Sequence, residues 1–114
     1  DVMVFAGFSQ GAAMAFRAAV SAAAPRRHVI AVGGDVPPEL GPEELRKLSS
    51  VLICRGAEDK WYTPGTFAAD VQRLQAAGLA VQARVLAGGH EWSPEVSEAA
   101  GRFLREQATI AASE

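Results

Sequence analysis

Residues 5–16 read FAGFSQGAAMAF, a stretch that is apolar and alanine-rich except for one serine and one glutamine between two glycines. Gly7, Ser9 and Gly11 form the pattern G-x-S-x-G, which is typical of a serine held on a sharp turn between a strand and a helix. We expect a Cβ at either glycine to clash, because such a turn brings neighbouring backbone segments very close together. The pattern is short enough to arise by chance, so the rest of the chain must decide its meaning.

Apolar runs and helix-forming segments alternate along the chain. The run at residues 2–6 is typical of a strand buried on both faces of a parallel sheet, and further strands are predicted at 28–34, 50–56 and 79–89. Helices are predicted from residue 10 to about 22, as one or two turns from 42, from 64 to about 78, and from 94 to about 108. Thr63 and Ser93 are suited to cap the last two helices, since a proline follows each of them.

This order of elements predicts an α/β fold with a mostly parallel sheet flanked by helices, in one domain over residues 1–114. The last strand should lie at a sheet edge, because Val81, Ala83 and Val85 alternate with polar residues. In sheets of this kind the ligand binds beyond the carboxyl ends of the strands. The turns that follow the strands are therefore expected to hold the chemistry.

The composition argues against several classes of function. The chain has 11 basic and 13 acidic side chains, spread without blocks, which offers no footprint for nucleic acid or for an anionic membrane surface. No apolar stretch approaches the ~20 residues that span a bilayer. With two distant histidines and one cysteine, no zinc site, other metal or cofactor is expected. Cys54 should be a small buried hydrophobe, which is compatible with a reducing, cytoplasmic location.

Three of the four turns after the predicted strands offer groups that fit together chemically. Ser9 follows the first strand, Asp59 follows the third in RGAEDKWYTP, and His90 follows the fourth in AGGHEW. A serine hydroxyl is a poor nucleophile near neutral pH unless a base removes its proton. A histidine does this best when a buried carboxylate holds its tautomer. The chain order Ser, Asp, His is the one associated with α/β-hydrolases.

The segments GFSQGAAMA, RGAEDKWYTP and GGHEW resemble the carboxyl-terminal half of an α/β-hydrolase, and the resemblance covers nearly the whole chain. They look most like the small, lidless carboxylesterases, phospholipases and acyl-thioesterases. The resemblance implies that Ser9 is the nucleophile, Asp59 the orienting acid and His90 the general base. It also implies that further strands and an oxyanion loop lie upstream of Asp1. Residues 1–114 would then form only part of a domain, and by themselves they would have weak activity or none.

Two of these assignments have competitors in the sequence. Asp35 follows the second strand and competes with Asp59, because acids in that position serve some hydrolases of this fold. The prolines two and three residues after Asp35 suggest that its loop shapes the site instead. The second histidine, His28, precedes a strand beside two arginines, and a solvent-facing structural role is expected for it.

Four more residues are expected near the site. The backbone N–H of Gln10 should point from the start of the helix toward the place where a tetrahedral oxyanion would form. Trp61, Tyr62 and Trp92 are candidates for lining an acyl or alcohol pocket, although aromatic residues in loops also cover the edges of cores. In the sequences that this chain resembles, smaller apolar residues often follow the acid, so the aromatic pair suggests a reshaped pocket.

The expected function is that of a serine hydrolase acting on carboxylic esters or thioesters through an acyl-enzyme. A non-catalytic binding module that keeps the fold, and a peptidase of the same fold, are the alternatives. The resemblance further implies that the strand at residues 2–6 is central in the complete fold. Without its neighbour this strand would present a bare apolar edge, through which we expect self-association.

Overall fold

Four parallel strands form a single sheet in the order β1-β2-β3-β4. The computed structural model describes residues 2–113. The strands are β1 (Val2–Phe8), β2 (Arg26–Val32), β3 (Ser50–Gly56) and β4 (Ala80–Leu86), and the helices are α1 (Gln10–Ser21), α2 (Pro42–Leu45), α3 (Pro64–Ala76) and α4 (Pro94–Ala112). The predicted α/β class and the parallel sheet are therefore confirmed.

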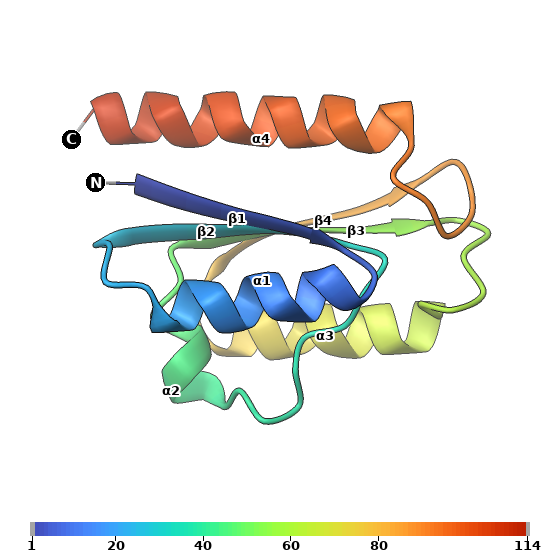
Figure 1. Ribbon diagram of the computed structural model, residues 1–114, viewed down its shortest axis with the longest axis horizontal. Helices are drawn as coiled ribbons and strands as arrows, with labels where there is room; N and C mark the ends of the chain where they lie inside the picture. The colour runs from blue at the N-terminus through green and yellow to red at the C-terminus, as the bar shows by residue number, and fades with distance from the viewer. Residues whose placement is uncertain (1, 114) are drawn as a thin grey trace.

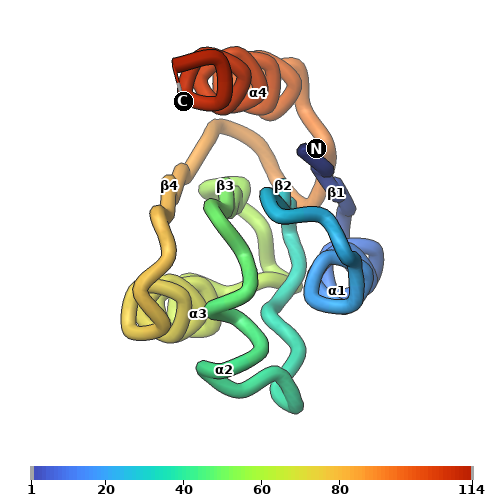
Figure 2. Tube along the Cα trace, turned by 90° about the vertical axis from the view of Figure 1, so that its left-hand side faces the viewer, coloured from blue at the N-terminus to red at the C-terminus, as the bar shows by residue number. Residues whose placement is uncertain are grey.

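The helices cover the two faces of the sheet unequally. Figure 1 shows α1, α2 and α3 on one side of the sheet and α4 alone on the other, and Figure 2 shows the same layers from the end. The inner strands β2 and β3 are almost wholly buried, as apolar strands between two helical layers should be. Because all four strands are parallel, their carboxyl ends lie at the same edge of the sheet, and the turns that follow the strands lie there too.

Each face of the sheet has its own hydrophobic core. On the α1 and α3 side, Phe16 and Leu74 pack with strand residues such as Val29 and Ile53. On the α4 side, Phe103 packs with alternate strand residues that include Leu52 and Cys54. Burial raises the pKa of the Cys54 thiol to about 11, so Cys54 is the inert buried residue that the sequence predicts.

Local capping residues set the starts of α3 and α4 as predicted. The Thr63 hydroxyl accepts a hydrogen bond from the Thr66 N–H at 3.3 Å, and the Ser93 hydroxyl accepts one from the Val96 N–H at 3.2 Å. Such caps satisfy N–H groups that have no partner within the helix. At the end of α3 the chain turns at Gly78, whose φ is +90°.

The observed elements differ from the predicted ones at some boundaries. Helix α4 continues to Ala112 instead of fraying after residue 108, because its last turns contain no glycine or proline to stop it. Strand β2 begins at Arg26, two residues earlier than predicted, and β1 extends to Phe8. Hydrogen bonds between neighbouring strands lengthen both of them, and local sequence patterns do not show this effect.

The first strand is not buried on both faces, contrary to the expectation for residues 2–6. β1 pairs only with β2, and its first three side chains are 45%, 42% and 38% exposed, for Val2, Met3 and Val4 respectively. This position at the end of the sheet is the bare apolar edge expected of a strand without its second neighbour. β4 forms the opposite edge, as its alternating pattern predicts.

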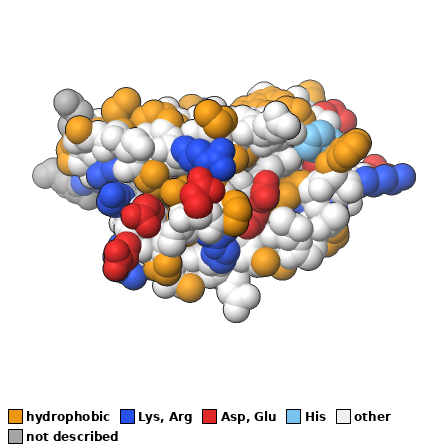
Figure 3. Space-filling view, turned by 60° about the horizontal axis from the view of Figure 1, so that its bottom comes forward, with side chains coloured by type: hydrophobic (Ala, Val, Ile, Leu, Met, Phe, Trp, Pro, Cys, Tyr) orange, Lys and Arg blue, Asp and Glu red, His pale blue; other side chains and the backbone are white. Residues whose placement is uncertain are grey.

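Charged side chains are interspersed on the surface. On the face that Figure 3 shows, acidic and basic side chains lie among hydrophobic and neutral ones and do not gather by sign. The exposed side chains of Arg17 and Glu39 form an ion pair 2.7 Å long.

Candidate active site

Ser9 occupies the tight turn between β1 and α1. Its φ of 60° and ψ of −123° make it the only non-glycine residue with a positive φ among residues 2–113. The turn is held in place because the Ser9 N–H donates to the carbonyl of Val32, on the neighbouring strand, at 2.8 Å. A residue kept in such an unfavourable conformation is typical of functional sites. The sharp strand-to-helix turn predicted from G-x-S-x-G is thus present.

The two glycines of the pattern have different surroundings. A Cβ on Gly7 would lie 1.9 Å from the carbonyl oxygen of Gly11, which no side chain tolerates. A Cβ on Gly11 would meet nothing within 4 Å outside its own helix, so the expected clash there is wrong. The Gly11 carbonyl group is the part of Gly11 that lies close to Gly7, and the space where a Cβ on Gly11 would lie is open. Gly34, which the sequence analysis did not single out, is also constrained, since its Cβ would lie 2.0 Å from the Ser9 carbonyl oxygen.

His90 reaches back from the loop between β4 and α4 to the Ser9 turn. Its Nε2 lies 2.9 Å from the Ser9 hydroxyl, and its Nδ1 lies 2.8 Å from Asp59 Oδ2. In the tautomer with the proton on Nδ1, the ring donates to the carboxylate and accepts from the serine hydroxyl. The ring also packs against Phe8 at a centroid distance of 4.8 Å. Three turns from distant parts of the sequence thereby form one continuous chain of hydrogen bonds.

Asp59 is held by its own loop as well as by His90. Its carboxylate is 3% exposed, and Oδ1 accepts hydrogen bonds from the N–H groups of Trp61 and Tyr62 at 2.8 and 2.9 Å. Burial raises the pKa of this carboxyl, but the hydrogen bonds from Tyr62, His90 and Trp61 outweigh burial, so that the pKa lies below its usual value. Asp59 is therefore a carboxylate at neutral pH, able to stabilise an imidazolium.

Neither of the two competing residues belongs to this hydrogen-bonded series. Asp35 is exposed and lines a cavity that also borders Ser9, whereas Asp59 is the acid that is hydrogen-bonded to His90. His28 is buried, contrary to the expected solvent-facing role, and its Nδ1 lies 2.7 Å from the Ser50 hydroxyl. Its ring packs in a T-shaped arrangement against the ring of Phe103 in α4, with the two ring centres 6.2 Å apart. The prediction of solvent exposure for His28 was wrong because α4 packs against this residue, and the neighbouring arginines in the sequence give no sign of that contact.

A cavity of about 270 Å³ opens at the Ser9 hydroxyl. Its lining residues are Ser9, Gln10, Gly33, Gly34, Asp35, Trp61, Tyr62, Thr66 and His90. Trp61 and Tyr62 thus lie where the sequence suggested, with the Trp61 side chain 83% exposed and the Tyr62 side chain buried. Trp92 is not among the lining residues, and its indole N–H donates to the Ser97 hydroxyl at 2.8 Å. Their roles in a substrate pocket remain predictions.

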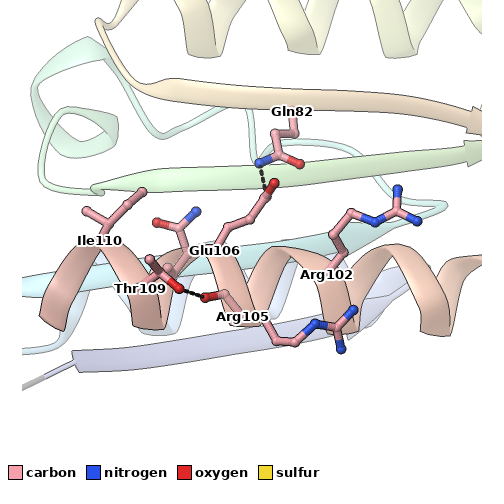
Figure 4. Close-up of a pocket in the computed structure, with 7 residues that line it drawn as sticks. Gln82, Arg102, Arg105, Glu106, Thr109 and Ile110 are labelled. Atoms are coloured by element: carbon pink, nitrogen blue, oxygen red, sulfur yellow. Dashed lines mark hydrogen bonds between the residues drawn. The ribbon is translucent and has the colours of Figure 1, made fainter. Parts of the chain in front are cut away.

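A larger cavity, of about 550 Å³, lies between β4 and the carboxyl-terminal half of α4 (Figure 4). A hydrogen bond of 2.8 Å from Gln82 Nε2 to Glu106 Oε1 crosses it. Its lining residues are Gln82, Arg102, Arg105, Glu106, Gln107, Thr109 and Ile110. This set contains no histidine, serine or cysteine, whereas the smaller cavity is lined by both Ser9 and His90.

Gln10 is the first residue of α1 and borders the cavity at Ser9. An N–H in the first turn of a helix has no partner within that helix, and the positive end of the helix dipole adds to its attraction for negative charge. The structure therefore allows the Gln10 N–H to donate a hydrogen bond to an anion in the cavity. Among the described residues, no group of three or more His, Cys, Asp or Glu side chains could hold a metal ion. None of the helices in this part of the chain is long and apolar enough to cross a membrane.

Two supporting residues were missed at the level of sequence. Arg55 is buried near the end of β3, where its guanidinium donates to the carbonyls of Asp59 and Tyr62 at 2.9 and 2.8 Å. Its signal was a single cation next to the apolar run SVLIC, which is unusual for a buried strand. Asp70 is buried in α3, and only its place on the inner face of the helix marks it.

The parallel sheet and the strand-to-helix turn at Ser9 define an α/β-hydrolase fold. Two solved structures share it. Esterase PE8 has 26% sequence identity and a TM-score of 0.73, covering 90% of this chain and 49% of its own. Acyl-protein thioesterase 2 of Zea mays has 20% identity and a TM-score of 0.67, covering 89% of this chain and 54% of its own.

The chain belongs to the phospholipase/carboxylesterase family, whose model matches residues 1–108. This confirms the resemblance stated from the sequence. The chain spans about half the length of the two solved structures. A comparison with curated protein sequences gives no match.

Proposed function

We propose that this chain carries the catalytic residues of a serine hydrolase that cleaves carboxylic esters or thioesters through an acyl-enzyme. The observation that carries the proposal is the hydrogen-bonded series Ser9, His90, Asp59, with successive distances of 2.9 and 2.8 Å. Membership of the phospholipase/carboxylesterase family supports an esterase-type hydrolase. Thioesters are included because the sequence resembles acyl-thioesterases, and the fold is shared with acyl-protein thioesterase 2 of Zea mays.

In the proposed reaction the Ser9 hydroxyl attacks the substrate carbonyl while His90 Nε2 takes its proton. Asp59 keeps the imidazole in the required tautomer and stabilises the imidazolium that forms. His90 then returns the proton to the leaving alcohol or thiol, which leaves an ester on Ser9. Water, deprotonated by the same imidazole, hydrolyses that ester and releases the acid and the free serine.

The oxyanion formed in each step needs hydrogen-bond donors. The Gln10 N–H is the donor that we propose from this chain, and losing one such donor typically raises the barrier by about 2.7 to 4 kcal/mol. The family resemblance predicts a second donor upstream of Asp1, so we expect weak turnover from these residues alone. A cytoplasmic location also remains a prediction.

Labelling with a fluorophosphonate tests the proposal directly, because only an activated serine reacts with it. We expect the parent chain to be labelled and Ser9→Ala to abolish the label. Ser21→Ala, an exposed serine at the end of α1, is the matched control and should be labelled like the parent. An unlabelled but folded parent would favour the binding-module alternative. A comparison of ester and amide substrates separates the esterase from a peptidase.

We also propose that the exposed edge of β1 pairs with a second copy of this chain. The edge presents backbone N–H and C=O groups beside Val2, Met3 and Val4, which favours pairing with another strand. A lysine in place of Val4 should weaken such pairing, because a charge at an edge opposes it. Sedimentation velocity should show oligomers for the parent and a shift toward monomer for Val4→Lys.

Val85→Lys is the matched control, since Val85 is exposed on the opposite edge strand, β4. This variant should sediment like the parent. The pairing proposal is wrong if the parent stays monomeric at high concentration, or if Val85→Lys disperses the oligomers and Val4→Lys does not.

A further inference from the structure

A buried carboxylate lies next to the site without belonging to the proposed series of catalytic residues. The Asp70 side chain, in the middle of α3, is 4% exposed. Its Oδ2 accepts a hydrogen bond from the Tyr62 hydroxyl at 2.6 Å and one from the Val36 N–H at 3.3 Å. Burying a carboxylate is costly unless it is well bonded, so its position calls for an explanation beyond packing.

The first bond connects Asp70 to the loop that carries Asp59. Tyr62 uses its backbone N–H to bond Asp59 Oδ1, at 2.9 Å, and its hydroxyl to bond Asp70. The Tyr62 carbonyl is held in turn by Arg55. A shift of Tyr62 would therefore move a donor away from the carboxylate that orients His90.

The second bond connects Asp70 to the loop after β2. Arg73, three residues further along α3 and on the same side of the helix, donates to the carbonyls of Val36, Pro37 and Leu40 at 3.2, 3.2 and 2.6 Å. This loop begins at Gly33 and Gly34, where the backbone of Gly34 lies directly against the Ser9 carbonyl. One face of α3 thus holds the loop beside the nucleophile.

We infer that Asp70 is a positioning residue of this active site, which through Tyr62 fixes the loop of Asp59 relative to the loop beside Ser9. A single oxygen atom, Asp70 Oδ2, receives hydrogen bonds from both loops. The inference rests on the proposed function, because the positioning matters for catalysis only if Asp59 and Ser9 act as described. The inference adds a functional role for α3, which is to hold the two loops in place through Asp70.

Three substitutions test the bond between Tyr62 and Asp70. Tyr62→Phe removes the hydroxyl, Asp70→Ala removes the acceptor, and Asp70→Asn keeps an oxygen that can accept. We expect the first two to slow fluorophosphonate labelling of Ser9 about tenfold, which corresponds to about 1.4 kcal/mol. Asp70→Asn should stay within about threefold of the parent. The double variant Tyr62→Phe with Asp70→Ala should be no slower than the slower single one, since both remove the same bond.

A structural readout separates this inference from the proposed function. The imidazole N–H proton of His90, observed by NMR, reports the hydrogen bond to Asp59 whether or not the serine reacts. It should shift or broaden in Tyr62→Phe and Asp70→Ala, and it should stay in place in Asp70→Asn. The buried ring of His28, bonded to Ser50, gives an internal reference that should not move.

The controls cover loss of folding. Gln72→Ala changes an exposed residue of α3 and should label like the parent, and circular dichroism shows whether each variant is folded. The inference is overturned if folded Tyr62→Phe and Asp70→Ala keep both the parent labelling rate and the parent His90 resonance. If the parent is not labelled but the His90 resonance responds as expected, the positioning stands and the proposed function fails.

Discussion

Replacing His90 by alanine is expected to slow phosphonylation of Ser9 by about four orders of magnitude, so that His90→Ala labels no better than Ser9→Ala. The reason is geometric: the ring is the only group shown to bond both the Ser9 hydroxyl and the Asp59 carboxylate among the described residues. Without it, nothing in hydrogen-bond contact with the hydroxyl takes its proton. The measurement is the rate of label incorporation over a range of probe concentrations.

Glu91→Ala is the matched control for this experiment. Glu91 is the exposed neighbour of His90, and its carboxylate has only a weak contact of 3.4 Å with the Gly89 N–H. This variant should label at close to the parent rate. Labelling of His90→Ala at the parent rate would show that another group activates the serine, and the proposed mechanism would have to be abandoned.

Gly7→Ala should destabilise the fold by about 3 kcal/mol or more. The added methyl carbon would lie 1.9 Å from the Gly11 carbonyl oxygen, and neither atom can rotate away, because the methyl is fixed on the Cα and the oxygen belongs to the backbone. Relief of such a contact requires a shift of β1 against α1, which breaks close packing. Urea denaturation measures the effect as a lower midpoint of unfolding.

Gly11→Ala is the comparison that makes this prediction specific. Both glycines belong to the same short pattern, but a Cβ on Gly11 meets nothing within 4 Å outside its helix. Because alanine is favoured over glycine inside a helix by up to about 1 kcal/mol, this variant should be as stable as the parent or more so. Equal destabilisation by both substitutions would mean that the turn at Ser9 does not have the observed geometry.

Much of the fold was predictable because it depends on neighbours in the sequence. Thr63 and Ser93 cap helices by accepting hydrogen bonds from N–H groups three residues away, so their role can be predicted without knowledge of any tertiary contact. The placement of Ser9, Asp59 and His90 after the ends of parallel strands followed from the alternation of strands and helices. The same reasoning misplaced His28, whose surroundings come from α4, more than 60 residues later.

The supporting residues show a second limit. Arg55 and Asp70 bind carbonyl and hydroxyl groups of the loop that follows β3. The sequence marks Arg55 as a cation beside an apolar run, but it does not indicate which groups either residue binds. The pattern G-x-S-x-G also does not show that a side chain is excluded at Gly7 but not at Gly11, whose carbonyl oxygen is the atom that a Cβ on Gly7 would meet. Both facts depend on how closely two backbone segments approach, which is a property of packing.

By itself, the sequence determined the kinds of elements, their order and the turns that carry polar groups, since strands, helices and caps arise from short-range chemistry. Only the tertiary structure decided that Asp59, and not Asp35, bonds to His90, and that His28 is buried beside α4. These outcomes depend on which distant segments become neighbours in the sheet. Hydrogen bonds act over about 3 Å, and only the folded sheet brings residues 81 and 31 positions apart within that range.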